Sequence, residues 1–132
     1  MTRPSAPRDR VLVVDDAANL RELLTLLIDT EDDFEVIGTA CDGAQALAVA
    51  ETLRPDIVLL DLAMPVMDGM QALPRIRALL PAAMIVIFSG FEQSSLIDEA
   101  LAAGADAYLE KGASVMQLVD LLRERRGRAP RP

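Results

Sequence analysis

Several apolar runs in this sequence end on side chains that could take part in chemistry. These residues are Asp15, Asp16, Asp61, Ser89 and Lys111. Three carboxylates brought together would suit a hard cation such as Mg²⁺, which prefers oxygen ligands. A lysine beside them would supply the compact positive charge that binds phosphate. Because a carboxylate can act as a nucleophile toward phosphorus, this set of side chains favours phosphoryl chemistry.

Asp61 follows the apolar run 58–60, and turn signals come after it at Pro65 and Asp68-Gly69. A short apolar run bounded by turn signals predicts a buried parallel strand. Asp61 would then lie at the carboxyl end of the strand, which is the edge where open α/β sheets bind ligands. The alternative is that Asp61 only caps a turn, since aspartate is common in turns.

The other candidates also have structural alternatives. Asp15 and Asp16 could be helix N-caps, Ser89 a turn residue and Lys111 a solvated cation. However, Lys111 is the only lysine among thirteen lysines and arginines, which suggests a need for a point charge. Four of the five predicted strands would deliver a polar side chain to the same edge. We therefore expect a common site.

Composition bounds the class of protein. The chain has 132 residues, 52% hydrophobic and 26% charged, which fits one globular domain. It contains no histidine, so histidine metal ligands and serine–histidine triads are excluded. The net charge of −8 argues against direct binding of nucleic acid. With no membrane-length apolar run, no signal peptide and a single cysteine, Cys41, we expect a cytoplasmic protein without membrane contact.

Strand and helix patterns alternate five times along the chain. The predicted strands are residues 10–14, 35–40, 58–60, 84–88 and 107–109. The helical pattern covers residues 17–30, 43–53, 69–80, 96–104 and 115–122. Pro74 should kink or delay the third helix, and Gly104 should end the fourth. This order predicts an α/β fold with a parallel sheet and helices on both faces.

One domain should use nearly the whole chain. We place it at residues 9–126, after a flexible N-terminal arm at 1–8. A basic, proline-containing tail is expected from Arg123, with residues 127–132 as a C-terminal tail or the start of a linker.

Taken jointly, the motifs resemble the response-regulator receiver domain of bacterial two-component signalling, over roughly residues 9–126. The motifs that carry the resemblance are Asp15-Asp16, Leu59-Leu60-Asp61, Met64-Pro65, Asp68-Gly69, Ser89-Gly90 and Tyr108-Leu109-Glu110-Lys111. The stretch 61–76 is similar to receivers of LuxR/NarL-type regulators, and stand-alone receivers share the same motifs. The resemblance implies a flavodoxin-like (βα)5 doubly wound parallel sheet with strand order 2-1-3-4-5.

The resemblance also implies roles for the acidic residues. Asp61 would be the phosphoacceptor. Asp16 and Asp61 would hold Mg²⁺, or Mn²⁺, by carboxylate and Ala63 by its backbone carbonyl, with Asp15 acting through water.

For the remaining motif residues, the family implies phosphoryl binding and switching. Ser89 and Lys111 would each contact a phosphoryl oxygen, and Gly90 would leave room beside the group. Tyr108 would turn inward when Ser89 moves. Its alternative is an ordinary half-buried strand tyrosine.

The sequence departs from the family pattern at two places. Gly112 follows Lys111 where the family usually has proline, often in a cis peptide. A cis bond without proline costs about 3 kcal/mol, so the loop is open to either a trans bond or greater mobility. Ala63 and Phe91 occupy the positions that tune loss of the phosphoryl group, and neither side chain can orient a water. We therefore expect slow autodephosphorylation.

By this resemblance the protein is not a conventional enzyme: a sensor histidine kinase or phosphotransfer protein would phosphorylate it. The surface around the fourth helix, fifth strand and fifth helix would then control a downstream protein or output domain. A homodimer formed on phosphorylation is a further expected partner, although no residue decides it.

Four other functions are compared with this one. The chain could be the receiver half of a transcription factor, cut before its helix-turn-helix domain. An aspartyl-nucleophile phosphatase needs a second aspartate at position 63, where this chain has Ala63. A flavin or nucleotide carrier needs a glycine-rich loop after the first strand, which Asp15 and Asp16 replace. The last is a degenerate receiver that only binds proteins, and the complete set of site residues argues against it.

Overall fold

The computed structural model of this chain describes residues 8–90 and 94–128. Five parallel strands form one sheet in the order β2-β1-β3-β4-β5. The strands are β1 (Asp9–Val14), β2 (Phe34–Ala40), β3 (Ile57–Leu60), β4 (Met84–Ser89) and β5 (Ala107–Glu110). The helices are α1 (Ala18–Asp29), α2 (Gly43–Leu53), α3 (Gly69–Leu79), α4 (Ser94–Ala102) and α5 (Val115–Arg128). The predicted flavodoxin-like (βα)5 fold is confirmed.

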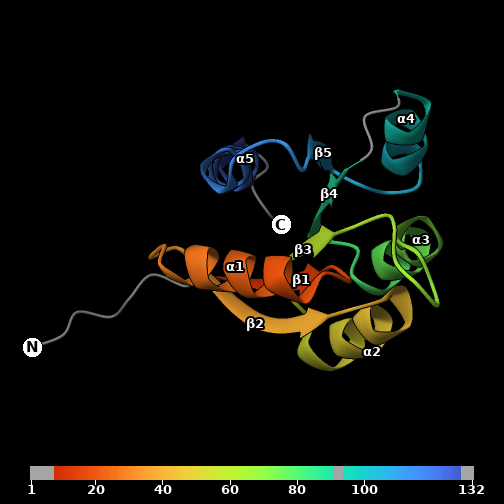
Figure 1. The fold of residues 1–132 in the computed structure, drawn as a ribbon, viewed down its shortest axis with the longest axis horizontal. Helices are drawn as coiled ribbons and strands as arrows, with labels where there is room; N and C mark the ends of the chain where they lie inside the picture. Colours follow the sequence, from red (N-terminus) through yellow and green to blue (C-terminus); the bar gives the residue numbers. More distant parts are fainter. Residues whose placement is uncertain (1–7, 91–93, 129–132) are drawn as a thin grey trace, which may run out of the picture.

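The sheet lies between two layers of helices (Figure 1), with α1 and α5 on one face and α2, α3 and α4 on the other. Side chains along each strand alternate between these layers. In β1, Leu12 and Val14 pack toward α2 and α3, whereas Val11 and Val13 pack toward α1 and α5. All four residues of β3 are buried, as expected for a central parallel strand.

Side-chain caps hold the starts of α2, α3 and α5, and at the start of α5 Ser114 and Gln117 bond each other reciprocally. The Asp42 carboxylate accepts a hydrogen bond from the Gln45 N–H at the start of α2. At the start of α3, Asp68 and Gln71 form a reciprocal capping box. By contrast, α1 begins after Ala17 without a side-chain cap. The alternative that Asp15 and Asp16 serve as N-caps is therefore wrong.

Two details of the helices differ from expectation. Helix α3 runs without interruption through Pro74, whose ring is exposed, so the proline does not delay the helix. Helix α5 continues to Arg128, so the tail expected from Arg123 begins later. Within this extension, the Arg123 guanidinium pairs with Glu31 at 2.6 Å and with Asp33 at 2.8 Å, which ties the helix to the α1–β2 connection. As predicted, Gly104 follows the end of α4, with φ of +122°.

The two ends of the chain leave some expectations open. Residues 1–7 and 129–132 lie outside the described part, so the flexible arm and the basic tail stay predictions. Within the described part, no helix combines the length and the apolar character that crossing a membrane requires.

Candidate functional site

Three carboxylates meet at the carboxyl edge of the sheet. Asp15 and Asp16 follow β1, and Asp61 follows the neighbouring β3. One carboxylate oxygen from each lies within 4.8 Å of the others. Asp15 and Asp61 are buried, whereas Asp16 is exposed. The parallel sheet therefore brings together the three acids that the sequence singled out.

Lys111 bridges two of these acids from the end of β5. Its Nζ lies 2.8 Å from Asp15 Oδ2 and 3.3 Å from Asp61 Oδ2. The Lys111 backbone N–H donates to the Ser89 carbonyl at 2.8 Å, which ties the lysine to β4. The structure has no cis peptide in the part of the chain that it describes, so the Lys111–Gly112 bond is trans. Lysine placement at this site therefore does not depend on a proline.

The charges in the site are unbalanced. Burial and the neighbouring Asp15 raise the pKa of Asp61, and Lys111 only partly opposes them. Burial would lower the pKa of Lys111, but its contacts with Asp15 and Asp61 outweigh burial and raise that pKa. Lys111 pairs with Asp15 and Asp61 but not with Asp16, so the three clustered carboxylates outnumber their one ammonium partner and the site favours a further positive charge.

Asp15 has a bonding partner at every polar atom. Its Oδ1 accepts from the Ala17 N–H at 2.9 Å, and its Oδ2 pairs with Lys111. Its backbone N–H donates to Ala40, and its carbonyl accepts from Arg21 Nη1 at 2.8 Å. The sequence pattern does not single out Arg21, because a bond to a backbone carbonyl leaves no motif.

The loop between β3 and α3 packs tightly against Asp61. The Gly69 N–H donates to the Leu62 carbonyl at 2.9 Å. A Cβ at Gly69 would overlap the backbone oxygen of Asp61, so this position requires glycine. Within the loop, Val66 has φ of +67°, which is strained for a β-branched residue. The Ala63 N–H lies 3.4 Å from Asp61 Oδ1.

Ser89 is the last residue of β4, and Gly90 follows it. Strand β4 lies next to β3, on the side away from β1. Ser89 is fully buried, and its Oγ has no hydrogen-bond partner among the residues that the structure describes. A Cβ added at Gly90 would meet no described atom within 4 Å. A small donor and an open space therefore lie together at this strand end. Phe91 lies outside the described residues.

Tyr108 lies on the same face of the sheet as Ser89. In the β4–β5 register, Ile87 pairs with Tyr108 and Ser89 with Glu110, so Ser89 and Tyr108 are diagonal neighbours. The ring is half-buried against the α2–α3–α4 layer. Burial raises the pKa of the Tyr108 hydroxyl, and the Ser89 hydroxyl opposes that rise.

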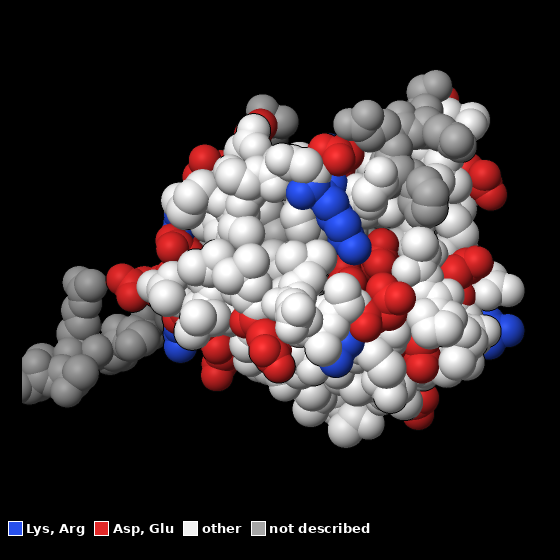
Figure 2. All heavy atoms as spheres, in the orientation of Figure 1, with Lys and Arg blue, Asp and Glu red and all other residues white. Residues whose placement is uncertain are grey.

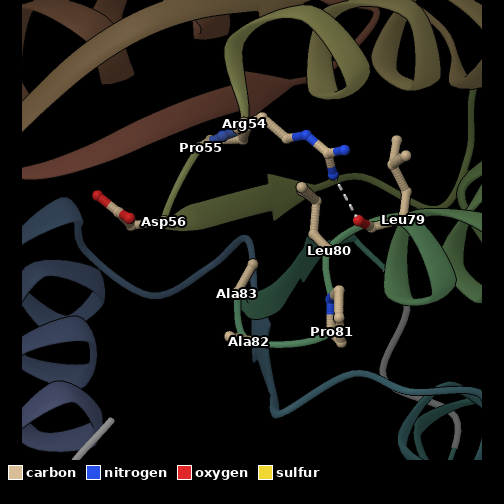
Figure 3. A pocket seen from close by; sticks show the side chains of 8 residues that line it. All are labelled: Arg54, Pro55, Asp56, Leu79, Leu80, Pro81, Ala82 and Ala83. Carbon is tan, nitrogen blue, oxygen red and sulfur yellow. Dashed lines mark hydrogen bonds between the residues drawn. The ribbon is translucent and has the colours of Figure 1, made fainter. Parts of the chain in front are cut away.

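Of two hollows on the surface, one is lined in part by predicted site residues and the other is not. An open hollow of 670 Å³ lies beside the acids, and Asp16, Leu62, Ala63, Met64, Pro65, Asp68, Met70 and Leu96 line it. A second hollow of 210 Å³ lies between the α2–β3 and α3–β4 connections (Figure 3), where Arg54 Nη1 donates to the Leu79 carbonyl at 2.8 Å. None of the predicted site residues lines this second hollow. Of the two hollows, only the first has predicted site residues, Asp16 and Ala63, in its lining.

The surface view shows how charge is distributed. Acidic atoms gather near the middle of one face with basic atoms directly beside them, and further acidic groups lie around its edge (Figure 2). The donor set at the carboxyl edge consists of carboxylate oxygens from Asp15, Asp16 and Asp61. Hard oxygen donors and excess negative charge fit Mg²⁺, or Mn²⁺, better than a soft metal.

Comparison with known proteins agrees with this geometry. Residues 11–123 match the sequence model of the response regulator receiver domain. The receiver domain of the response regulator NarL from Mycobacterium tuberculosis has a TM-score of 0.84 and 31% identity, covering 90% of this chain and 96% of that one.

Two curated relatives are longer proteins. A protein-glutamate methylesterase/protein-glutamine glutaminase from Caldanaerobacter subterraneus is 44% identical over 110 residues, which are 83% of this chain and 30% of that protein. The response regulator protein VraR from Staphylococcus aureus is 35% identical over 115 residues, which are 87% of this chain and 55% of that protein. This chain thus spans about a third to just over half of these relatives. The fold, the carboxyl-edge site and the match across residues 11–123 together show that the chain belongs to the response regulator receiver domain family.

Proposed function

We propose that Asp61 accepts a phosphoryl group from a phosphohistidine on a sensor kinase or phosphotransfer protein. An Asp61 carboxylate oxygen attacks phosphorus, the nitrogen–phosphorus bond breaks, and the imidazole of the donor keeps the electron pair. The observation that carries this proposal is the position of Asp61: a buried carboxylate beside Lys111, with two more carboxylates within 4.8 Å. Positioning and charge neutralisation suffice for such a transfer, so no general base is needed.

The acidic residues would hold the divalent cation. Asp16 and Asp61 would bind it by carboxylate and Ala63 by its backbone carbonyl. Asp15 would act through water, since Ala17 and Lys111 already occupy its two carboxylate oxygens. A bound Mg²⁺, or Mn²⁺, would neutralise the charge of the phosphoryl oxygens and of the carboxylates.

The remaining residues would bind the phosphoryl group and report on it. Lys111 and the unbonded Ser89 hydroxyl would each contact a phosphoryl oxygen, while Gly90 leaves space for the group. Tyr108, diagonal to Ser89, would follow the movement of Ser89. The surface of α4, β5 and α5 would then change and control a partner, which could be a second copy of the chain.

The longer relatives bear on what this switch controls. The matched region makes up 30% of a methylesterase/glutaminase and 55% of VraR, so an attached output domain is favoured over a stand-alone receiver. The alternative that we keep is the receiver half of a DNA-binding regulator with a helix-turn-helix domain. An aspartyl-nucleophile phosphatase is disfavoured, because Ala63 offers no acid or base two residues after Asp61.

The test is the intact mass of the protein after incubation with acetyl phosphate, with and without Mg²⁺. We expect a single Mg²⁺-dependent phosphoryl adduct in the wild type and none in Asp61→Asn. An adduct that persists in Asp61→Asn would move the acceptor to another residue. If acetyl phosphate gives no adduct, a phosphorylated kinase is the second donor, and failure with both donors would refute the proposal.

A further inference from the structure

Asp16 is the least supported of the three clustered acids. It is exposed, and among residues 8–90 and 94–128 its carboxylate has no hydrogen bond or ion pair. Asp15 is held by Lys111 and by Ala17, and Asp61 by Lys111 and by burial. The position of the Asp16 carboxylate therefore depends on the backbone that carries it, between Asp15 and Ala17.

Two side-chain contacts hold this backbone at the turn, in addition to the backbone bonds from the Asp15 N–H to Ala40 and from the Arg21 N–H to Ala17. The Ala17 N–H donates to Asp15 Oδ1 at 2.9 Å, which is a contact within the loop itself. The other comes from α1: Arg21 Nη1 donates to the Asp15 carbonyl at 2.8 Å. That carbonyl belongs to the peptide bond that joins Asp15 to Asp16, so its direction sets the direction in which Asp16 leaves the strand.

The bond from Arg21 to the Asp15 carbonyl also lies at the start of helix α1. This helix starts without a side-chain cap and has no acidic residue in its first turn, so apart from the backbone bond from the Arg21 N–H to the Ala17 carbonyl, the Arg21 side chain is the helix contact that holds the loop in the described chain. The half-buried Arg21 lies one turn into α1 and reaches back over this uncapped end. Its guanidinium also places positive charge at the backbone of Asp15, in a cluster whose one direct cationic partner within residues 8–90 and 94–128 is Lys111.

We propose that Arg21 is a positioning residue for the divalent-cation site, and that it acts through the Asp15 carbonyl to aim Asp16 at the cation. The proposal rests on the function proposed above, in which Asp16 is a metal ligand. Groups that orient metal ligands commonly contribute 10- to 100-fold to metal affinity. Arg21 should thus control the affinity for Mg²⁺ and contribute little to the stability of the metal-free fold.

The experiment is an Mg²⁺ titration of the full chain without a phosphoryl donor, followed by the backbone amide signals in NMR. Arg21→Met removes the donor and keeps most of the aliphatic length, whereas Arg21→Lys keeps one donor that can reach a carbonyl. Arg75→Met is the matched control, because Arg75 is exposed on α3 and shows no hydrogen bond within the described chain. Unfolding of each variant in EDTA reports on the metal-free fold.

We expect Arg21→Met to raise the Kd for Mg²⁺ about tenfold, Arg21→Lys to recover most of the affinity, and Arg75→Met to match the wild type. The unfolding midpoint in EDTA should change by less than about 4 °C. Equal Mg²⁺ affinity in Arg21→Met and wild type would overturn this inference alone. A midpoint lowered by more than about 8 °C would make Arg21 a structural residue and would also overturn it. No Mg²⁺ binding by the wild type would overturn the proposed function and this inference together.

Discussion

At the amino edge of the sheet, the Arg77 guanidinium donates hydrogen bonds from all three nitrogens, whereas at the carboxyl edge Lys111 pairs with two of the three clustered carboxylates. Arg77 donates to four carbonyls and to Asp106 Oδ2, at 2.6–3.2 Å. The carbonyls belong to Leu80, Pro81, Ala83 and Gly104. Asp106 also accepts from the Ile85 N–H at 2.8 Å. The charges of Arg77 and Asp106 are thus matched with each other.

The carboxyl edge leaves polar groups unmatched. The Ser89 hydroxyl is buried without a partner in the described chain, and Asp61 has a raised pKa. A buried polar group without a partner costs free energy, which natural structures usually avoid. The difference between the edges suggests that the amino edge stabilises the sheet, while the carboxyl edge gives up stability to remain reactive.

The largest expected effect comes from removing the Arg77 hydrogen bonds at the amino edge of the sheet. Arg77→Met removes the hydrogen bonds to four carbonyls and to Asp106, although Asp106 keeps its bond from the Ile85 N–H, so we expect a loss of about 3 kcal/mol in the free energy of unfolding. Phosphorylation of Asp61 should continue, because the change lies at the opposite edge. Urea unfolding followed by circular dichroism measures the loss, with Arg75→Met as the exposed control. A loss below about 1 kcal/mol would mean that the Arg77 contacts are not a stabilising network.

The next effect concerns how long the reactive edge holds a phosphoryl group. Ala63→Asn and Phe91→Glu each add a group that can orient water, so we expect autodephosphorylation to quicken on the order of tenfold, about 1.4 kcal/mol in the barrier. Intact mass after removal of the donor gives the rate, and Ala82→Asn at the exposed amino edge is the control. A wild-type adduct that decays within seconds, or variants that decay no faster, would contradict the prediction.

A smaller effect follows from the unbonded hydroxyl. Ser89→Ala removes a buried group that has no partner in the described chain, so stability should stay the same or rise by up to about 1 kcal/mol. Phosphorylation by acetyl phosphate should slow, because a phosphoryl oxygen loses a donor. Unfolding and labelling rates are measured on the same samples. Destabilisation beyond about 1 kcal/mol would show that the hydroxyl is bonded in the unphosphorylated protein.

The smallest expected effect is a change in the free energy of unfolding with pH. Because the pKa of Asp61 is higher in the folded state, the unfolded chain loses this proton first as pH rises. The contribution of Asp61 to stability is therefore complete below its unfolded value of 3.8 and falls as pH rises through the folded pKa. In EDTA, wild type should lose stability relative to Asp61→Asn between pH 4 and 8. A gain over that range would reverse the inferred direction of the pKa.

Much of this molecule could be predicted from local patterns. Apolar runs that end on Asp61 and Ser89 sufficed to place those residues at one edge, because parallel strands all end there. The patterns could not reveal the contacts of Arg77, Arg21 or Arg123. Arg123 pairs with Asp33, which lies 90 positions away, and such a pair has no local signature.

Tyr108 has a practical consequence for spectroscopy. The chain contains one tyrosine and no tryptophan, so tyrosine emission from this protein comes from a single ring. That ring lies diagonal to Ser89 on the neighbouring strand and is half-buried. Excitation near 280 nm would thus follow one position beside Asp61 in the unmodified protein, without a dye or an introduced tryptophan. The chain carries its own optical probe at the place where a change of state would begin.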